Sequence, residues 1–291
     1  MKMIFILISL FSFSVWSAEA PVTLKLLTWN VYMLPKPVKF SVQGDRTQLI
    51  INELLKVDHD VIVLQEAFMK CFRRKVGEAL KSKYPYQVDL GRSGRWKHVM
   101  TSGLFALSRY PMSSIDYNYY NQCTGADCFA AKGVLLLNLE LPSGRNVHLS
   151  TTHLNAGDEE HNRRARWSQV EEIHDFYSRG VSARSESIPL ILAGDLNIDV
   201  KEDDFHKTLS LLNMETPQVE NPDVPSSSYD IPCYKSVKYP AKQMVDNVLL
   251  NPRKARAVIQ HKRIRPFFGK IKGVECPLSD HQAIEAQIRI L

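Results

Sequence analysis

Several short apolar runs in this sequence end in a polar side chain that is costly to bury alone. The runs are rich in Leu, Ile and Val and have the length of buried strands, and polar groups stand directly after or before them. Strands fix the backbone while their ends stay open, so these groups can meet at one edge of a sheet. The residues in these positions are Asn30, Glu66, His153, Asp195 with Asn197, and the pair Asp280-His281.

Strand-like runs alternate with helical patterns along the whole chain. The apolar runs predict strands near 23–29, 60–65, 103–108, 133–141, 146–152, 188–193, 244–250 and 282–290. Apolar residues at helical spacing predict helices near 46–56, 70–81, 162–178 and 203–212. The order mixes strand–helix units with hairpins, such as one turning at 142–145, so we expect a layered α/β protein and not a purely parallel doubly wound sheet.

The N-terminus has the anatomy of a secretory signal peptide. Met1-Lys2 precedes an apolar stretch at 3–15 that is too short to span a bilayer, followed by small residues at Ser17, Ala18 and Ala20. We expect residues 1–17 to be the signal peptide and 18–291 a single catalytic domain of a secreted protein, extracellular or periplasmic. Cleavage after Ala20 and an uncleaved anchor are the alternatives.

Secretion predicts an oxidising compartment in which cysteines can pair. Of the five cysteines, Cys123 and Cys128 enclose only four turn-rich residues, which brings their thiols close without long-range folding. We therefore predict this disulfide and expect it to hold a loop near the site. A pair between Cys233 and Cys276 stays open.

The chain has a formal net charge of +6, and basic residues are concentrated at 253–272 around Phe267-Phe268. Basic residues beside exposed aromatics suit an anionic or zwitterionic membrane surface. The alternative is a solvated hairpin whose phenylalanines fold inward.

Asp195 and Asn197 are two residues apart, so in an extended backbone their side chains share one face. A carboxylate there can orient a water or hold a metal, and an amide can donate to a phosphoryl oxygen. The alternative is an Asx turn that closes a strand. We expect Gly194 to let a substrate approach the backbone.

Glu66 follows a buried run abruptly and needs a partner. Mg²⁺ is the natural one, with Mn²⁺ or Co²⁺ in its place as alternatives, and Asn30 is a second ligand. The imidazole of His281, next to Asp280, can take a proton from water near neutral pH. Asp246 is a charge inside an apolar strand and fits as the group that orients this imidazole.

Six strings in this order resemble the endonuclease/exonuclease/phosphatase superfamily, which includes the deoxyribonuclease-I-like nucleases. They are TWN at 28–30, LQE at 64–66, THLNAGD at 152–158, GDLN at 194–197, VDNVLL at 245–250 and SDH at 279–281. The resemblance spans nearly the whole predicted mature chain. It implies a four-layer α/β/β/α sandwich with the site at one end of the two sheets.

Within the superfamily the chain resembles the secreted bacterial sphingomyelinases of the β-toxin type. The THLNAGD segment with the following Arg166, Gln169, Glu172 and Ile173, the Cys123/Cys128 loop before Lys132-Gly133, and the string LSRYP at 107–111 carry this resemblance. Two features depart from the pattern. Thr101-Ser102-Gly103 replaces an acidic residue before Gly-Gly, and the hairpin around Phe267-Phe268 is shorter.

The resemblance implies Mg²⁺-dependent hydrolysis of sphingomyelin to ceramide and phosphocholine at a phospholipid membrane surface. Glu66 and Asn30 would hold the metal, and Asp195 and His281 would activate water. Asp246 and Asp280 would set the imidazole, while Asn197 and His153 would stabilise the transition state, with His153 also a proton donor to the leaving group. The alternatives are a secreted nuclease that binds nucleic acid through Arg163, Arg164 and Arg166, and an inactive lipid-binding module.

Overall fold

The computed structural model describes residues 20–35, 42–91, 98–180, 187–227, 243–252 and 257–291. The predicted signal peptide, residues 1–17, lies outside the described residues. Cys233 lies outside them as well, whereas Cys276 is disulfide-bonded. No described helix is long and apolar enough to cross a membrane.

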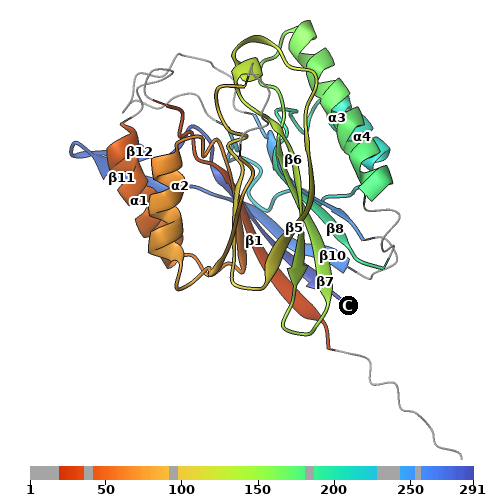
Figure 1. The fold of residues 1–291 in the computed structure, drawn as a ribbon, viewed down its shortest axis with the longest axis horizontal. Coiled ribbons are helices and arrows are strands. Elements are labelled where there is room, and N and C mark those ends of the chain that lie inside the picture. Colours follow the sequence, from red (N-terminus) through yellow and green to blue (C-terminus); the bar gives the residue numbers. More distant parts are fainter. Residues whose placement is uncertain (1–19, 36–41, 92–97, 181–186, 228–242, 253–256) are drawn as a thin grey trace, which may run out of the picture.

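Two mixed β-sheets pack face to face at the centre of the molecule (Figure 1). The first has the order β10 (Ala257–Arg265), β13 (Ala283–Ile290), β1 (Val22–Asn30), β2 (Val61–Gln65), β4 (Phe105–Ser108) and β3 (Tyr86–Asp89). The second has the order β5 (Met112–Tyr119), β6 (Gly133–Glu140), β7 (Asn146–His153), β8 (Leu190–Asp195) and β9 (Asp246–Asn251).

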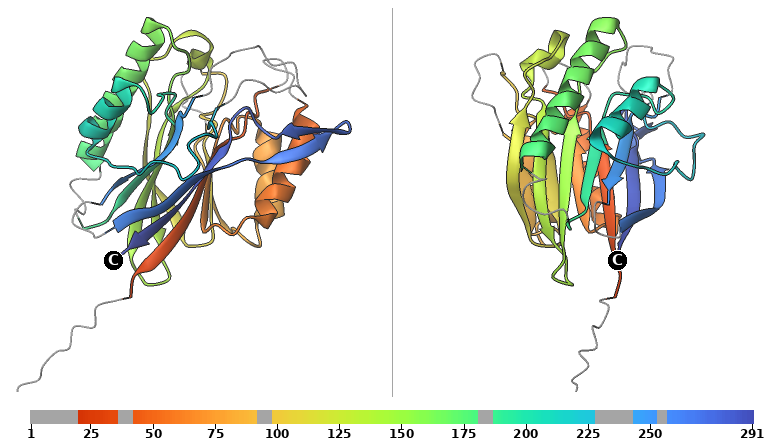
Figure 2. Two further views of the ribbon diagram at one scale, coloured as in Figure 1. Left: turned by 180° about the vertical axis from the view of Figure 1, so that it is seen from behind. Right: turned by 90° about the vertical axis from the view of Figure 1, so that its right-hand side faces the viewer.

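Helices cover the outer face of each sheet. Figure 2 shows α1 (Gln43–Lys56) and α2 (Lys70–Leu80) on one side, and α3 (Glu160–Gly180) and α4 (Asp203–Leu212) on the other. A 3₁₀ turn (Gly125–Phe129) precedes β6, and the hairpin of β11 (Phe268–Ile271) and β12 (Val274–Pro277) lies against α1. The four-layer α/β/β/α sandwich is therefore confirmed.

Strand β1 shows how the pattern of side chains generates these layers. Leu24 and Leu26 point between the sheets, whereas Leu27 and Trp29 pack with α1 and α2. Because successive side chains of a strand point to opposite faces, a strand covered on both sides reads as one continuous apolar run. The predicted strands and helices are all present, and β11 and β12 form the hairpin expected near Phe267-Phe268. The structure adds β3, β5 and β10, which the sequence patterns did not predict.

The strands that were missed lie at the edges of the sheets. β5 is largely exposed, and β10 alternates buried apolar residues with charged ones. An edge strand has one face or one side in water, so it does not need the apolar run on which the prediction depended.

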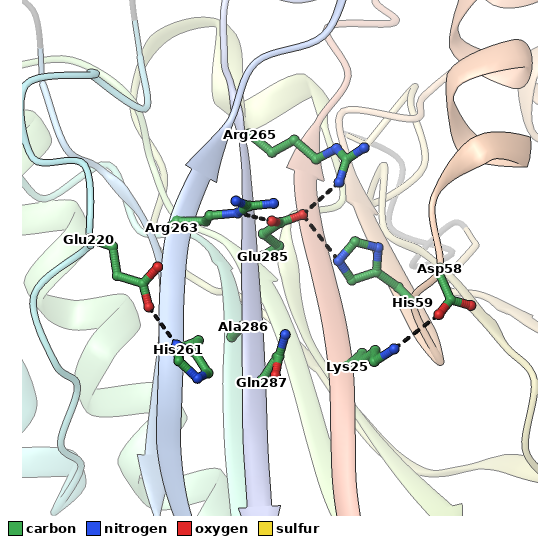
Figure 3. A pocket seen from close by; sticks show the side chains of 10 residues that line it. All are labelled: Lys25, Asp58, His59, Glu220, His261, Arg263, Arg265, Glu285, Ala286 and Gln287. Carbon is green, nitrogen blue, oxygen red and sulfur yellow. Dashed lines mark hydrogen bonds and ion pairs between the residues drawn. The ribbon is translucent and has the colours of Figure 1, made fainter.

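The part of the outer face that runs from Lys25 of β1 across β13 to β10 lies beyond the helices and forms a charged cavity of about 350 Å³ (Figure 3). Glu285 at its centre accepts hydrogen bonds from Arg263 and Arg265 and pairs with His59 at 3.3 Å. These cations hold the pKa of Glu285 down at about 2, although burial acts to raise it. Part of the predicted basic patch is thus neutralised within the fold.

The two phenylalanines of the predicted hairpin have different surroundings. Phe267 is buried against Trp29, with ring centroids 4.7 Å apart, whereas Phe268 is 48% exposed at the start of β11. The inward-folding alternative is therefore correct for Phe267, and the exposed-aromatic interpretation is correct for Phe268.

Gly194 is required where β7 and β8 approach each other. A Cβ atom on Gly194 would lie 2.1 Å from the carbonyl oxygen of Thr152 on the neighbouring strand. The expectation that this glycine admits a substrate is corrected, because the group that approaches it is the backbone of β7.

We expect Gly194→Ala to destabilise the protein by about 1–3 kcal/mol, because the two paired backbones must separate to admit the methyl group. Denaturant unfolding would measure the change. Gly91→Ala is the matched control, since a Cβ there meets nothing within 4 Å. Equal stability of the two variants would contradict the argument.

Candidate functional site

Three predicted site residues form one row across the end of the second sheet. In the register of β7, β8 and β9, His153 is the partner of Asp195, and Asp195 is the partner of Asp246. All three side chains are almost completely buried. Strand pairing therefore places one imidazole and two carboxylates side by side. The outermost two, His153 and Asp246, are more than 90 positions apart in the chain.

The first sheet contributes Asn30 and Glu66 at the same end of the sandwich. β1 and β2 are parallel, with Asn30 paired to Gln65, so their carboxyl ends meet at one edge. Glu66 directly follows β2 and has a φ of 54°. A non-glycine residue is strained in this left-handed region, and such strain is typical of functional positions.

Asp280 and His281 reach the site through the loop before β13. The guanidinium of Arg46 on α1 donates to the carbonyl oxygens of Leu278 and Val31. The indole of Trp29 donates to the carbonyl of His281 over 3.0 Å. These bonds fix the loop to the end of β1 and so place the imidazole opposite the second sheet.

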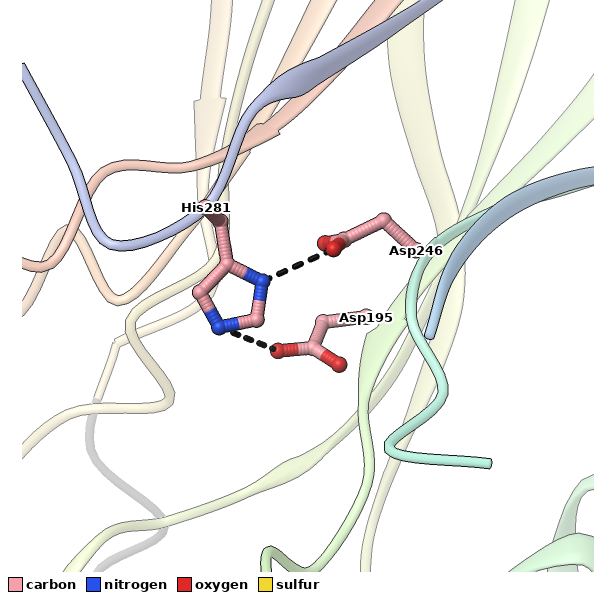
Figure 4. Close-up of side chains that lie close together, drawn as sticks. All are labelled: Asp195, Asp246 and His281. Carbon is pink, nitrogen blue, oxygen red and sulfur yellow. Dashed lines mark hydrogen bonds and ion pairs between the residues drawn. The ribbon is translucent and has the colours of Figure 1, made fainter. Parts of the chain in front are cut away.

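His281 lies between two carboxylates (Figure 4). Its Nδ1 is 2.7 Å from Asp246 Oδ2, and its Nε2 is 3.7 Å from Asp195 Oδ2. Burial alone would lower the pKa of His281, but Asp246 and Asp195 raise it well above the ordinary value. The hydrogen bond to Asp246 therefore fixes the orientation of the imidazole, and Nε2 points toward Asp195.

Asp280 acts on two neighbours through its charge. Asp246 makes the hydrogen bond to the His281 imidazole, and the charge of Asp280 adds to the rise in the pKa of that ring. The same charge raises the pKa of Glu66. Burial and then this repulsion raise the pKa of Glu66 to about 7. A buried carboxylate whose pKa is raised by burial and by a neighbouring carboxylate favours the presence of a cation beside it.

The two predicted metal ligands, Asn30 and Glu66, differ in how well their side chains are placed to bind a cation. The Oε2 atom of Glu66 is buried and has no hydrogen-bond partner among the described residues. A divalent cation fits this unpaired carboxylate oxygen. The amide nitrogen of Asn30 donates to Glu66 and Asp195, and its oxygen accepts from the backbone of Tyr32. In this arrangement Asn30 holds the two carboxylates in place.

A second group can also hold a cation. Ligand atoms of Asp195, Asp246 and His281 all lie within 4.8 Å of one another. Carboxylate and imidazole groups accept Mg²⁺ as well as Mn²⁺ or Co²⁺, so the donor set does not select among these ions.

His153 is kept neutral by its surroundings. Its Nε2 lies 3.1 Å from Lys132 Nζ and 3.5 Å from Asp195 Oδ2. Burial, followed by the charge of Lys132, lowers the pKa of His153 to about 3. The structure therefore favours the predicted role in stabilising charge over the predicted role as proton donor.

Asn197 confirms the Asx-turn alternative for the GDLN string, and its role toward a phosphoryl oxygen stays a prediction. Its backbone N–H donates to Asp195 Oδ1 over 2.9 Å, which is an Asx turn, and its φ is 49°. The turn ends the strand and leaves the Asn197 amide beside the site, where Nδ2 donates to the carbonyl of Leu154. One N–H of that nitrogen is left for a ligand oxygen.

The predicted disulfide between Cys123 and Cys128 is confirmed. Asp127 in this loop accepts from the backbone N–H of Ala156 and pairs with Lys132 at 2.9 Å. Thr124 is joined to Asn155, two residues after His153. The loop thus holds the turn after β7 and positions Lys132. Cys71 is the one free cysteine among the described residues, and it is exposed.

Helix α3 supports the same turn from the other side. Arg166 donates to the carbonyl oxygens of Asn155 and Gly157, and Gln169 accepts from the Asn155 N–H. Glu172 accepts from the backbone of Asn121 at the start of the disulfide loop. The residues that carried the resemblance therefore brace the loops that surround His153.

Lys132 and Arg46 are site residues that the sequence pattern did not single out. Both are charged side chains that are almost fully buried. Lys132 could have been recognised by its position directly before the apolar strand β6, because the other site residues also lie at strand ends. Arg46 lies within an amphipathic helix, and no local pattern separates it from a solvent-facing arginine.

Comparison with known proteins agrees with this geometry. Residues 27–281 match the model of the endonuclease/exonuclease/phosphatase family. The chain belongs to this family. A Leptospira interrogans protein named sphingomyelinase C is 30% identical over 213 residues, which cover 67% of this chain and 38% of that protein. A Staphylococcus aureus protein named phospholipase C is 30% identical over 208 residues, covering 66% and 62%.

The alignments therefore span less than two thirds of these curated relatives. Among solved structures, a crystal structure of β toxin from Staphylococcus aureus superposes with a TM-score of 0.76 and 25% identity. That match covers 90% of this chain and 99% of the other. The structure of sphingomyelinase C from Streptomyces griseocarneus has a TM-score of 0.71 at 23% identity and shows the same fold.

We expect Lys132→Met to raise the pKa of His153 from about 3, because the substitution removes a positive charge 3.1 Å from the ring. A proton NMR titration of the histidine resonances would measure the shift. Lys207→Met is the control, since Lys207 pairs with Asp204 on the surface of α4. An unchanged His153 titration in Lys132→Met would contradict this electrostatic account.

Proposed function

We propose that this protein is a secreted, Mg²⁺-dependent phosphodiesterase that hydrolyses sphingomyelin to ceramide and phosphocholine. The observation that carries the phosphodiesterase is the imidazole of His281, held by Asp246 at 2.7 Å and facing Asp195, beside the unpaired Glu66 oxygen. This combination places a proton acceptor next to a cation site, which is the arrangement that hydrolysis of a phosphodiester requires.

Similarity to proteins named sphingomyelinase C and phospholipase C supports the choice of substrate. A related crystal structure is described as β toxin with bound magnesium ions, which supports the choice of metal. A bound Mg²⁺ would supply positive charge to neutralise the phosphodiester, with Glu66 and Asn30 as ligands. Secretion is supported by the N-terminal sequence alone.

The chain's own residues then account for proton transfer and orientation. Asp246 fixes the imidazole so that His281 Nε2 removes a proton from the attacking water. Asp195 Oδ2 lies 3.7 Å from the same nitrogen and orients that water. The neutral His153, with Asn197 and Lys132 beside it, stabilises negative charge that grows on the phosphoryl oxygens.

The hairpin of β11 and β12 is the surface we propose to contact the membrane. Phe268 and Val274 are 48% and 56% exposed, and Lys270 and Lys272 are exposed beside them. Exposed apolar residues with neighbouring lysines suit the interface of a phospholipid bilayer.

One of the three arginines expected to bind nucleic acid is not available for that contact. Arg166, expected to contact nucleic acid phosphates, is buried and donates to the backbone of Asn155 and Gly157. Arg163 lies 3.3 Å from Glu202, and Arg164 is exposed beside Glu160. Of the three arginines, at most the two exposed ones can reach a phosphate, and both have acidic neighbours.

The proposal is tested by measuring phosphocholine release from sphingomyelin vesicles and cleavage of duplex DNA, each with Mg²⁺ and with a chelator. We expect chelator-sensitive phosphocholine release, and we expect His281→Ala to reduce it by about 10²–10⁴-fold through loss of the proton acceptor. His174→Ala, an exposed histidine on α3, is the control. DNA cleavage alone would transfer the substrate to nucleic acid, and the absence of any turnover would favour a lipid-binding module.

The pH dependence of turnover tests the role of Asp246 separately. His281 must be unprotonated to accept a proton, and Asp246 raises the pKa of His281. Asp246→Asn removes this negative charge, so we expect the acidic limb of the kcat/KM profile to move to lower pH while the maximum falls. An acidic limb that stays in place would exclude His281 as the group that titrates, and Asp175→Asn on the surface of α3 is the control.

A further inference from the structure

Lys262 on β10 is a buried cation that the proposed catalysis does not use. Its side chain is 3% exposed. Nζ donates to Thr216 Oγ1 over 2.5 Å and to Asn247 Oδ1 over 2.9 Å, and both acceptors are neutral. Among the described residues no carboxylate lies within ion-pairing distance of it, and an ammonium group has three hydrogens to donate.

This amine lines a cavity of about 580 Å³ beneath the loop between α4 and β9. The remaining walls are mainly apolar and include Phe205, Leu209, Val219, Pro222, Pro225 and Met244. The volume lies within the range of small-molecule sites, which are mostly apolar with a few polar groups that fix orientation. None of the eight predicted catalytic and metal-binding residues lines it, so it is a separate site.

An unpaired ammonium group in an apolar cavity is complementary to one compact negative charge on an apolar body. A buried cation without a counter-ion is unfavourable, and pairing with an anion removes the penalty. A single carboxylate matches a single amine with one free hydrogen. Burial lowers the pKa of Lys262 to about 7, which shows how weakly its charge is compensated by the protein itself.

We propose that this cavity is a binding site for an aliphatic monocarboxylate, in which Lys262 pairs with the carboxylate and the walls from α4 and the 216–225 loop enclose the alkyl chain. The site is independent of the proposed catalytic function. The lining residues that carry other charges are Lys201, His206 and Asp223, and none of them hydrogen-bonds to Lys262.

Isothermal titration calorimetry of the full chain with octanoate tests this site, with octan-1-ol and acetate as the uncharged and the short analogues. We expect saturable octanoate binding, weaker binding of octan-1-ol because it cannot pair with the amine, and weaker binding of acetate because it fills none of the apolar volume. Octan-1-ol that binds as tightly as octanoate, or no octanoate binding at all, would overturn the proposal.

Three variants locate the site. Lys262→Met keeps the length of the side chain and should weaken octanoate binding by at least about tenfold, through loss of the charge pair. Lys201→Met, which removes a charge elsewhere on the lining, should leave the affinity within about twofold. Leu209→Trp fills the cavity and leaves the amine in place, so it should abolish binding. This variant tests the site independently if Lys262→Met does not fold. Octanoate affinity unchanged in Leu209→Trp would show that the ligand binds elsewhere.

Discussion

One amide, that of Asn30, joins the two sheets at the site, and the remaining geometry depends on it. Its nitrogen donates to Glu66 after β2 of the first sheet and to Asp195 at the end of β8 in the second. Both acceptors are carboxyl groups, with N···O distances of 3.1 and 2.9 Å, and a hydrogen bond to an ionised carboxylate is stronger than one between neutral groups. Together with the bond from Gln65 to Thr151 and the bond between His281 and Asp246, this amide fixes the separation of the two acidic groups.

Around this contact the protein tolerates a concentration of buried charge. The imidazole of His281 stabilises both Asp195 and Asp246, and it is the main reason why the pKa of Asp195 is held below its usual value although burial acts to raise it. Glu66 has no such partner on one oxygen, and its pKa is raised to about 7. A site with an uncompensated carboxylate is less stable than an apolar core but is prepared for a cation.

The strands that are covered on both faces could be predicted from the sequence, because their apolar runs have only one stable environment. β2 and β8 are of this kind, and so are the site residues Glu66 and Asp195 at their ends. The helices could be predicted from apolar residues at helical spacing, which form the face turned toward a sheet. Edge strands such as β5 and β10 could not be predicted, since half of each strand faces water and its charged residues resemble those of loops. Lys262 belongs to β10, which is why its burial was not anticipated.

By itself, the sequence determined that carboxylates, amides and imidazoles stand at strand ends, because buried strands impose apolar runs and polar groups can follow only where the run stops. Tertiary structure alone decided what each group contacts: Asp246 and not Asp280 bonds to His281, Lys132 lies against His153, and Arg166 braces a loop. These outcomes depend on sheet register and on distances of a few ångströms between segments far apart in the chain. Local patterns carry no information about such distances, and hydrogen bonding and charge interaction depend on them steeply.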